Sequence, residues 1–111
     1  MKEEYLLQKT IVDYIRDNYP KIVVFCVPNE AAHVAHHAPG ILKGAPDLIL
    51  VLPEKVVFLE LKSTNGRLSD QQCLFKTKVE LLGVEYHIIR DLIDVKDILK
   101  NNLPLEEWFD L

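Results

Sequence analysis

The stretch from Gly44 to Lys62, GAPDLILVLPEKVVFLELK, decides the fold of this chain. Two runs of Val, Ile, Leu and Phe flank Pro53-Glu54-Lys55, which is the pattern of a buried β-hairpin. Residues two apart in a strand share a face, so Glu60 and Lys62 point the same way. A two-residue loop would place Asp47 opposite Glu60, and a four-residue loop would place it opposite Lys62. Either register gathers the three charged side chains at the open end of the hairpin.

Charged side chains in such an apolar segment have two interpretations. Burying a charge is costly unless the group is paired, hydrogen-bonded or bound to a metal. In the structural interpretation, Lys62 forms a salt bridge with Glu60 or Asp47 at a solvated strand end. In the functional one, the two carboxylates hold a hard divalent cation and leave positions open for water and a phosphate. Lys62 would then orient that water and offset charge developing on the phosphate.

The same residues resemble the PD-(D/E)xK nuclease superfamily, because Pro46-Asp47 is followed by Glu60-Leu61-Lys62. More narrowly, the chain resembles the VRR-NUC family. That family has a Glu on an N-terminal helix, a G-x-P-D strand start, an E-x-K strand and L-S-x-x-Q opening a helix. All four occur here in order: Glu4 with Gln8 one turn later, GAPD at 44–47, ELK at 60–62 and LSDQQ at 68–72. The resemblance covers roughly residues 3–90.

The resemblance implies a metal-dependent endonuclease that hydrolyses DNA phosphodiester bonds. Asp47 and Glu60 would bind Mg²⁺ or Mn²⁺, with the main-chain carbonyl of Leu61 as a further ligand. Lys62 would steer the attacking water. In the resembled nucleases the glutamine that matches Gln72 lies at the catalytic centre.

Two of the candidate residues also have purely structural interpretations. Ser69 and Gln72 are spaced as a capping box, which by itself explains both as the start of a helix. Both roles could coexist, although one glutamine side chain is not expected to make both contacts fully at once. Glu4 would complement the dipole in the first turn of a helix. The resemblance instead makes Glu4 a candidate additional metal ligand.

Apolar periodicity along the chain predicts one mixed α/β domain over residues 1–111. The predicted order is helix 2–18, strand 21–29, the hairpin, helix 70–82, strand 84–90 and helix 94–102. The crossover rule favours parallel pairing of strand 84–90 with the strand that ends at Lys62. We therefore expect a central mixed sheet of about four strands flanked by helices (α-β-β-β-α-β-α). The resemblance implies that this is a restriction-endonuclease-like core.

Several burial predictions accompany this architecture. Strand 21–29 is almost continuously apolar and should be covered on both faces. Cys26 and Cys73 lack C-x-x-C spacing and are interpreted as reduced core residues, and His87 as a satisfied core histidine. The side chains predicted to be buried by helix 70–82 are Leu74, Phe75, Val79 and Leu82.

Charge and composition restrict the partners. The net charge of -4 and a pI near 5.5 do not match a broad basic DNA-binding surface, so we expect modest, salt-dependent affinity. Candidate nucleic-acid contacts are Lys43, Arg67, Lys76, His36 and His37, with Lys55 and Lys78 as further cations. His33 and His36 share a helical face, but no further ligands are spaced to complete a zinc site. No apolar run of about 18 residues or secretory pattern is present, which predicts a cytoplasmic protein without a membrane partner.

Substrate and assembly follow from the resemblance. Standalone members of the family resemble Holliday-junction resolvases that act as homodimers, so we expect a homodimer that selects branched DNA such as a junction or flap. Trp108 and Phe109 in the tail would dock on their own domain or on a second subunit. Two alternatives remain: a non-catalytic nucleic-acid-binding module of the same fold, and a protein-interaction domain.

Overall fold

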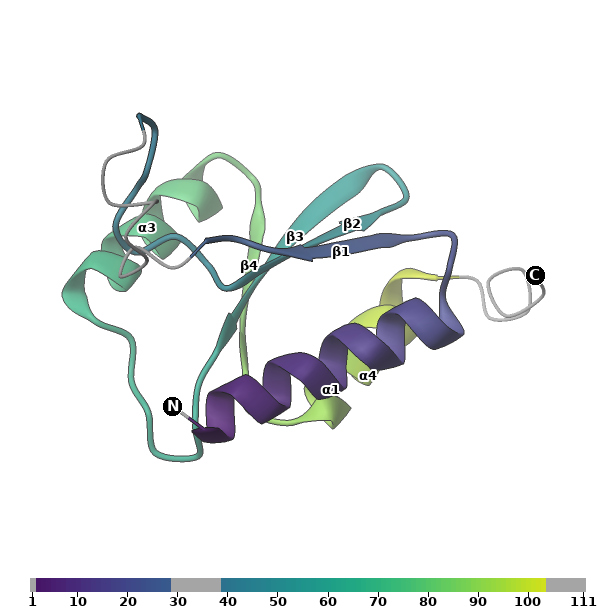
Figure 1. The fold of residues 1–111 in the computed structure, drawn as a ribbon. Coiled ribbons are helices and arrows are strands. Elements are labelled where there is room, and N and C mark those ends of the chain that lie inside the picture. Colours follow the sequence, from purple (N-terminus) through teal and green to yellow (C-terminus); the bar gives the residue numbers. More distant parts are fainter. Residues whose placement is uncertain (1, 29–38, 104–111) are drawn as a thin grey trace.

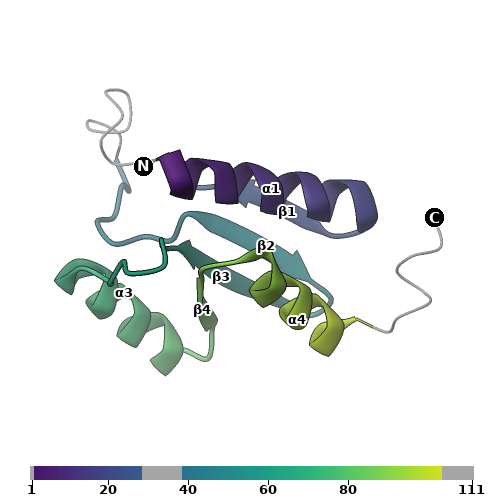
Figure 2. The same ribbon diagram turned by 90° about the horizontal axis from the view of Figure 1, so that it is seen from below.

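A computed structural model describes residues 2–28 and 39–103 of the chain. The elements are α1 (Lys2–Asn18), β1 (Val23–Cys26), β2 (Leu48–Leu52), β3 (Lys55–Leu61), α3 (Asp70–Leu81), β4 (Glu85–Ile89) and α4 (Leu92–Asn102). In Figures 1 and 2, α1 and α4 cover one face of the sheet, and α3 lies toward the other face beside β4. The predicted α/β fold with a mixed four-stranded sheet is confirmed.

The sheet has the strand order β1-β2-β3-β4. The β1–β2 and β2–β3 pairs are antiparallel, and β3 and β4 are parallel. The parallel pairing was predicted because α3 links the two strands as a crossover helix. A Schellman motif ends α3: Gly83, at φ +88, donates its N–H to Glu80, and the Val84 N–H reaches back to Val79. This closed helix end returns the chain directly into β4.

The β2–β3 hairpin adopts the shorter of the two predicted loops. Leu52 pairs with Lys55 and Leu48 with Leu59, so Pro53 and Glu54 alone form the turn. Glu54 has a positive φ of 61° directly after a proline, as in a type II turn. Extending the register by one residue places Asp47 opposite Glu60. The two carboxylates therefore meet on the same face at the open end of the hairpin.

The core lies between the sheet and the pair α1 and α4. Ile11 and Ile15, one helical turn apart on α1, are completely buried against the inner face of the sheet. Each fully buried Ile or Leu contributes about 1.5–3 kcal/mol relative to an exposed one. The other fully buried side chains are Leu48, Leu50, Val57, Leu59, Leu61, Ile89, Val95 and Leu99. Alternation along β2 and β3 leaves the intervening side chains, including Asp47 and Glu60, on the opposite face.

The prediction that strand 21–29 is covered on both faces is wrong. The strand extends only from Val23 to Cys26 and forms one edge of the sheet. Val24 is buried under α1, but Val23 is 52% and Phe25 43% exposed. The reason is that α3 packs over β3 and β4 and does not reach β1.

The predicted burial along α3 is only partly correct. Phe75 packs on the sheet, 5.7 Å from the Phe58 ring and 6.1 Å from the Tyr86 ring, and Val79 is half-buried. Leu74 and Leu82, however, are 57% and 81% exposed. The helix contacts the sheet through a narrow stripe of side chains. Its other side stays exposed because no second helix covers it in the described part of the chain.

Two further burial predictions are corrected. Cys26 and Cys73 are free thiols but are exposed, since β1 is an edge strand and α3 buries none of its residues fully. His87 is not in the core either. Its Nε2 lies 3.0 Å from Glu85 Oε1, and both side chains are about two-fifths exposed because β4 is the other edge of the sheet.

Several predictions concern residues outside the described ranges. The histidines His33, His36 and His37 lie there, as do the tail aromatics Trp108 and Phe109. Within residues 2–28 and 39–103, none of the helices has the length and apolar character needed to cross a membrane.

Candidate active site

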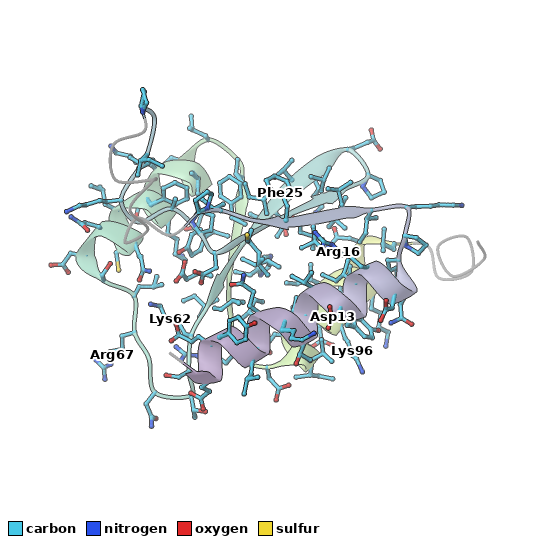
Figure 3. All side chains as sticks on the ribbon, viewed as in Figure 1. Asp13, Arg16, Phe25, Lys62, Arg67 and Lys96 are labelled. Carbon is cyan, nitrogen blue, oxygen red and sulfur yellow. The ribbon has the colours of Figure 1, made fainter. Side chains whose placement is uncertain are left out.

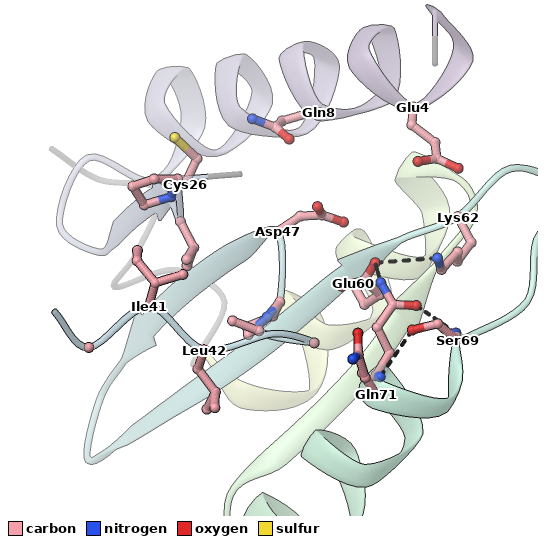
Figure 4. Close-up of a pocket in the computed structure, with 17 residues that line it drawn as sticks. Glu4, Gln8, Cys26, Ile41, Leu42, Asp47, Glu60, Lys62, Ser69 and Gln71 are labelled. Atoms are coloured by element: carbon pink, nitrogen blue, oxygen red, sulfur yellow. Dashed lines mark hydrogen bonds and ion pairs between the residues drawn. The ribbon is translucent and has the colours of Figure 1, made fainter. Parts of the chain in front are cut away.

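A cavity of about 600 Å³ opens where the start of α1, the open end of the hairpin and the start of α3 meet. All five side chains predicted to form the catalytic site line it: Glu4, Asp47, Glu60, Lys62 and Gln72. In Figure 4, Glu4 extends from α1, Asp47 lies near the centre, and Glu60 and Lys62 lie to one side. The fold thus brings together residues up to 68 positions apart in the sequence.

Asp47 is held by the strands on both sides of it. Its carbonyl oxygen accepts the N–H of Val27 at 2.9 Å, which continues the β1–β2 pairing beyond Cys26. Its carboxylate oxygen Oδ2 accepts the main-chain N–H of Leu61 at 2.8 Å. The cross-strand bond fixes the carboxylate beside Glu60 rather than leaving it free in solvent.

Glu60 is the only charged side chain among the described residues that is almost completely buried, at 2% exposure. Its Oε2 accepts the Nε2 amide of Gln72 at 3.0 Å and lies 3.6 Å from Lys62 Nζ. Its other oxygen, Oε1, is buried and has no hydrogen-bond partner in the described part of the chain. An unsatisfied buried carboxylate oxygen is rare and calls for a ligand.

Burial governs the ionisation of both carboxyl groups. Desolvation, reinforced by the neighbouring Asp47 carboxylate, raises the pKa of Glu60 to about 8 even though Lys62 opposes the shift. Desolvation also raises the pKa of Asp47, against the stabilising hydrogen bond from the Leu61 N–H. Two adjacent carboxyls that resist ionising together are stabilised by a cation between them.

The residues present fit a hard divalent cation. Carboxylate oxygens are the ligands that Mg²⁺ prefers, and Mg²⁺ needs only one or two of them because it retains water and binds substrate phosphate. The orphaned Glu60 Oε1 offers an oxygen with no competing partner. Across residues 2–28 and 39–103, no three His, Cys, Asp or Glu side chains cluster as a closed metal site. An open two-carboxylate site is what the geometry allows.

Gln72 contacts both the cap and Glu60, so the two contacts coexist, and each is made at full hydrogen-bond distance, which was not expected of one side chain. Its Oε1 accepts the Ser69 N–H at 2.9 Å, while the Ser69 hydroxyl accepts the Gln72 N–H at 3.1 Å. This reciprocal pair is the predicted capping box. Because the carbonyl end of the amide is used by the cap, the amino end is left to donate to Glu60. The cap therefore orients the amide toward the Glu60 carboxylate.

The backbone geometry at position 44, just before β2, requires a glycine. Gly44 has φ +87, and a Cβ at this position would lie 2.4 Å from the Gln71 carbonyl oxygen. Only glycine allows this approach of the segment before Asp47 to the first turn of α3. The contact joins the hairpin and the helix that supply Asp47 and Gln72.

Glu4 and Gln8 reach the cavity from α1 (Figure 4). The Glu4 carboxylate is half-buried, and its Oε2 accepts the Ser63 N–H at 3.3 Å. The helix begins at Lys2, so Glu4 lies in its first turn, as the structural interpretation expects. Its role as a metal ligand stays a prediction.

The predicted nucleic-acid contacts are less concentrated. Lys43 and Arg67 are exposed outside the cavity lining, and Figure 3 shows Arg67 on the loop that leaves Lys62. Lys76 pairs with Glu80 at 3.0 Å, one helical turn along α3. Lys55 lies at the closed end of the hairpin, where it pairs with Glu85. His36 and His37 are outside the described residues.

Two residues near the site had no sequence signal. Arg90 Nη1 donates to the Ser63 carbonyl at 2.6 Å and also reaches the Thr64 carbonyl, so it anchors the loop after Lys62. Tyr86 is 5% exposed, and its hydroxyl has no partner in the described residues. Burial, followed by the charge of Glu60, raises the pKa of Tyr86. Tyr86 lies on β4 and Arg90 follows its last residue, so only the pairing of β4 with β3 brings the two residues to the site.

Comparisons with known proteins agree with this architecture. The family model described as "VRR-NUC domain" matches residues 2–90. A solved structure titled "VRR_NUC domain" is similar, with 18% sequence identity, a TM-score of 0.67, and coverage of 91% of this chain and 98% of that one. No curated protein matches the chain. At this identity the structural likeness shows the fold, while the family model spans most of the chain and all of the site. The chain therefore belongs to the VRR-NUC family of nuclease domains.

Proposed function

We propose that this protein is a metal-dependent DNA endonuclease that hydrolyses phosphodiester bonds at the cavity of Asp47, Glu60 and Lys62. The observation that carries the proposal is the buried, unpartnered Oε1 of Glu60 beside the half-buried carboxylate of Asp47. As a purely structural element this arrangement would be destabilising, since two adjacent carboxyl groups are desolvated together and the pKa values of both are raised. As a site for Mg²⁺ or Mn²⁺ it is complementary to its ligand.

Each side chain then has a defined task. Asp47 and Glu60, with the Leu61 carbonyl, would hold the cation, which supplies Lewis-acid polarisation of the phosphate and acidifies water. Gln72 keeps Glu60 in place through its amide, so the carboxylate does not rotate away from the cavity. Asp47 is kept in place by the Leu61 N–H.

Lys62 is suited to act on the phosphate and on the attacking water. Its side chain is only 14% exposed, yet Nζ lies 3.6 Å from Glu60 Oε2, beyond a normal hydrogen bond. The ammonium group therefore retains donors for an incoming phosphate oxygen or water. Placed in advance at a desolvated site, such a charge stabilises the negative charge that develops as the P–O bond breaks.

The proposal extends to a branched substrate and a homodimer. With a net charge of -4, the chain has too few cations to bind DNA by a broad basic surface. Selectivity would instead come from the shape of the branched substrate and from the second active site of a dimer. The face of the sheet turned away from α1 supports self-association, since Val23, Phe25 and Val56 are 39–52% exposed there. Sedimentation of a monomer at micromolar concentration would remove the dimer while leaving the chemistry intact.

The test is cleavage of a labelled four-way junction and of a linear duplex of matching sequence by the purified protein. Reactions contain Mg²⁺, Mn²⁺ or EDTA, and Lys62→Ala serves as the inactive control. We expect metal-dependent cutting of the junction that is lost in the control. Equal cutting of both substrates would retain the nuclease and discard the structure selectivity.

The opposite outcome is equally clear. A folded protein that binds DNA with the same affinity in EDTA and cuts nothing with either metal would contradict the proposal. It would identify a binding module that has kept the fold.

A further inference from the structure

The cavity has a second end that the proposed chemistry does not use. Beyond Asp47, away from Glu60 and Lys62, it is lined by Cys26, Pro28 and Ile41, which we call the apolar wall. In Figure 4, Cys26 and Ile41 lie on one side of Asp47, and Glu60 and Lys62 on the other. All three residues of the wall are exposed, with Ile41 at 39%.

The cavity is larger than the reaction centre requires. A water molecule takes about 30 Å³ of liquid volume, so a hydrated cation and one phosphate fill only part of about 600 Å³. Part of the remaining space is bordered by Gln8 and Gln71, and part by the hydrophobic groups of the apolar wall, which gain nothing from contact with a phosphate or an ion. They would gain from contact with a flat, weakly polar ligand part.

We propose that the apolar wall receives an unstacked nucleobase of the nucleotide next to the scissile phosphate; this rests on the proposed nuclease function. A phosphate bound at Asp47 and Glu60 directs the neighbouring nucleotide along the cavity, because sugar and base are covalently attached to it. A base in an intact duplex has both faces covered by its neighbours and cannot pack on Pro28 or Ile41. Only an unpaired or frayed base can do so, as in base-flipping and single-strand-binding proteins.

This inference gives the substrate class a physical origin. Branch points, flaps and nicks present bases that are already unstacked, so the energy needed to expose one is smallest there. The packing contact itself is independent of base identity, since Pro28 and Ile41 offer no side-chain donors or acceptors to a base. The protein would then cut beside unpaired nucleotides with little sequence preference.

The test combines a protein change with a substrate change. Ile41→Ser is compared with wild type on a flap or junction with a normal base, and on matched substrates abasic immediately 5′ or 3′ of the cut. If the base packs on Ile41, the substitution weakens binding and cutting of the intact substrate by about 5- to 20-fold. It has no further effect on one of the two abasic substrates. Leu81→Ser is the matched control, because Leu81 is 82% exposed at the far end of α3 and lines no part of this cavity.

A second readout does not depend on turnover. In Ca²⁺, 2-aminopurine at the same position should brighten on binding to wild type, because unstacking relieves its quenching, and brighten less with Ile41→Ser. The proposal is overturned if Ile41→Ser acts equally on intact and abasic substrates, or on neither, while wild type still cuts. If wild type cuts no substrate under any metal, the nuclease assignment itself is what has failed.

Discussion

Two glutamate–lysine pairs lie at opposite ends of β3 and differ in almost every physical respect. At the closed end of the hairpin, Lys55 bonds Glu85, and their side chains are 38% and 41% exposed. At the open end, Lys62 and Glu60 are 14% and 3% exposed, and their charged atoms stay 3.6 Å apart. The hydrogen bond from Lys55 lowers the pKa of Glu85, whereas burial raises that of Glu60 despite the nearby lysine.

The difference shows that composition does not distinguish a structural ion pair from a site. Two unit charges 4 Å apart attract by only about 1 kcal/mol in water, and exposed pairs contribute little. In the buried pair the cost of desolvation exceeds the attraction to Lys62. The ionised form of Glu60 is therefore disfavoured unless a further positive charge binds beside it. Five observations would break or sharpen this contrast.

The largest expected effect is on catalysis. Asp47→Asn keeps the size and the hydrogen bond from the Leu61 N–H but removes the charge that would bind the cation. Cleavage of a labelled junction in Mg²⁺ should fall by roughly a thousandfold or more. Lys55→Ala, measured in parallel, should cut like wild type. Similar losses in both variants, with both proteins folded by circular dichroism, would erase the distinction between the two ends.

The next effect concerns the support of Glu60. Gln72→Ala removes the amide that holds Oε2. It should raise the Mg²⁺ concentration needed for half-maximal cutting by about 10- to 100-fold. Ser69→Ala loses the capping hydroxyl but keeps the main-chain N–H that orients Gln72. It should cost about 1 kcal/mol of stability with little change in metal dependence. Equal metal dependence in Gln72→Ala and wild type would show that Glu60 needs no support.

A stability measurement sharpens the comparison further. Glu60→Gln is neutral without taking up a proton, so it removes the free-energy cost that the raised pKa of Glu60 imposes on folding at pH 7, and it should raise the free energy of unfolding of the metal-free protein by roughly 1–3 kcal/mol. Urea denaturation in EDTA at pH 7 measures it. Added Mg²⁺ should stabilise wild type but not this variant. Destabilisation by the substitution would mean that the carboxylate is satisfied in the native protein.

The pH dependence follows from the same group. The pKa of Glu60 is about 8 in the folded chain, against an ordinary 4.5. Between about pH 5 and pH 8 the folded state therefore binds more protons than the unfolded state, and the stability of the metal-free protein falls as pH rises. Glu60→Gln should flatten much of that decline, with the remainder due to Asp47, whose pKa is also raised. Parallel wild-type and variant curves would contradict the assignment.

The smallest effect belongs to the exposed pair. Lys55→Ala should change the free energy of unfolding by no more than about 0.5 kcal/mol, since water screens the Lys55–Glu85 attraction. The change should shrink further in 1 M salt. A loss of several kcal/mol would place this pair in the same class as the buried one.

Sequence reasoning succeeded where the signal is local. The helix over 2–18, the hairpin and the Ser69–Gln72 cap depend on spacing within a few residues, and all three are present. The convergence of Asp47, Glu60 and Lys62 at the open end also followed from the alternation of a strand.

The errors have a common physical cause. Phe25, Cys26, Leu74 and His87 lie in segments whose own pattern predicts burial, but their exposure depends on which neighbour covers them. The sequence pattern of an apolar strand is the same whether the strand lies at the centre or at the edge of a sheet. Arg90 anchors the loop after Lys62 through contacts across 26 and 27 positions of the sequence. No local sequence pattern around Arg90 or around that loop predicts these contacts.

Gly44 has a consequence for how this protein responds to random mutation. A side chain there would collide with the main chain of Gln71 and push apart the two segments that present Asp47 and Gln72. The damage would reach the reacting atoms although Gly44 offers them no functional group. A genetic screen for loss of cutting should therefore return every substitution at Gly44, alanine included, among its null alleles, and a saturation map would score this silent position as highly as the acids it aligns.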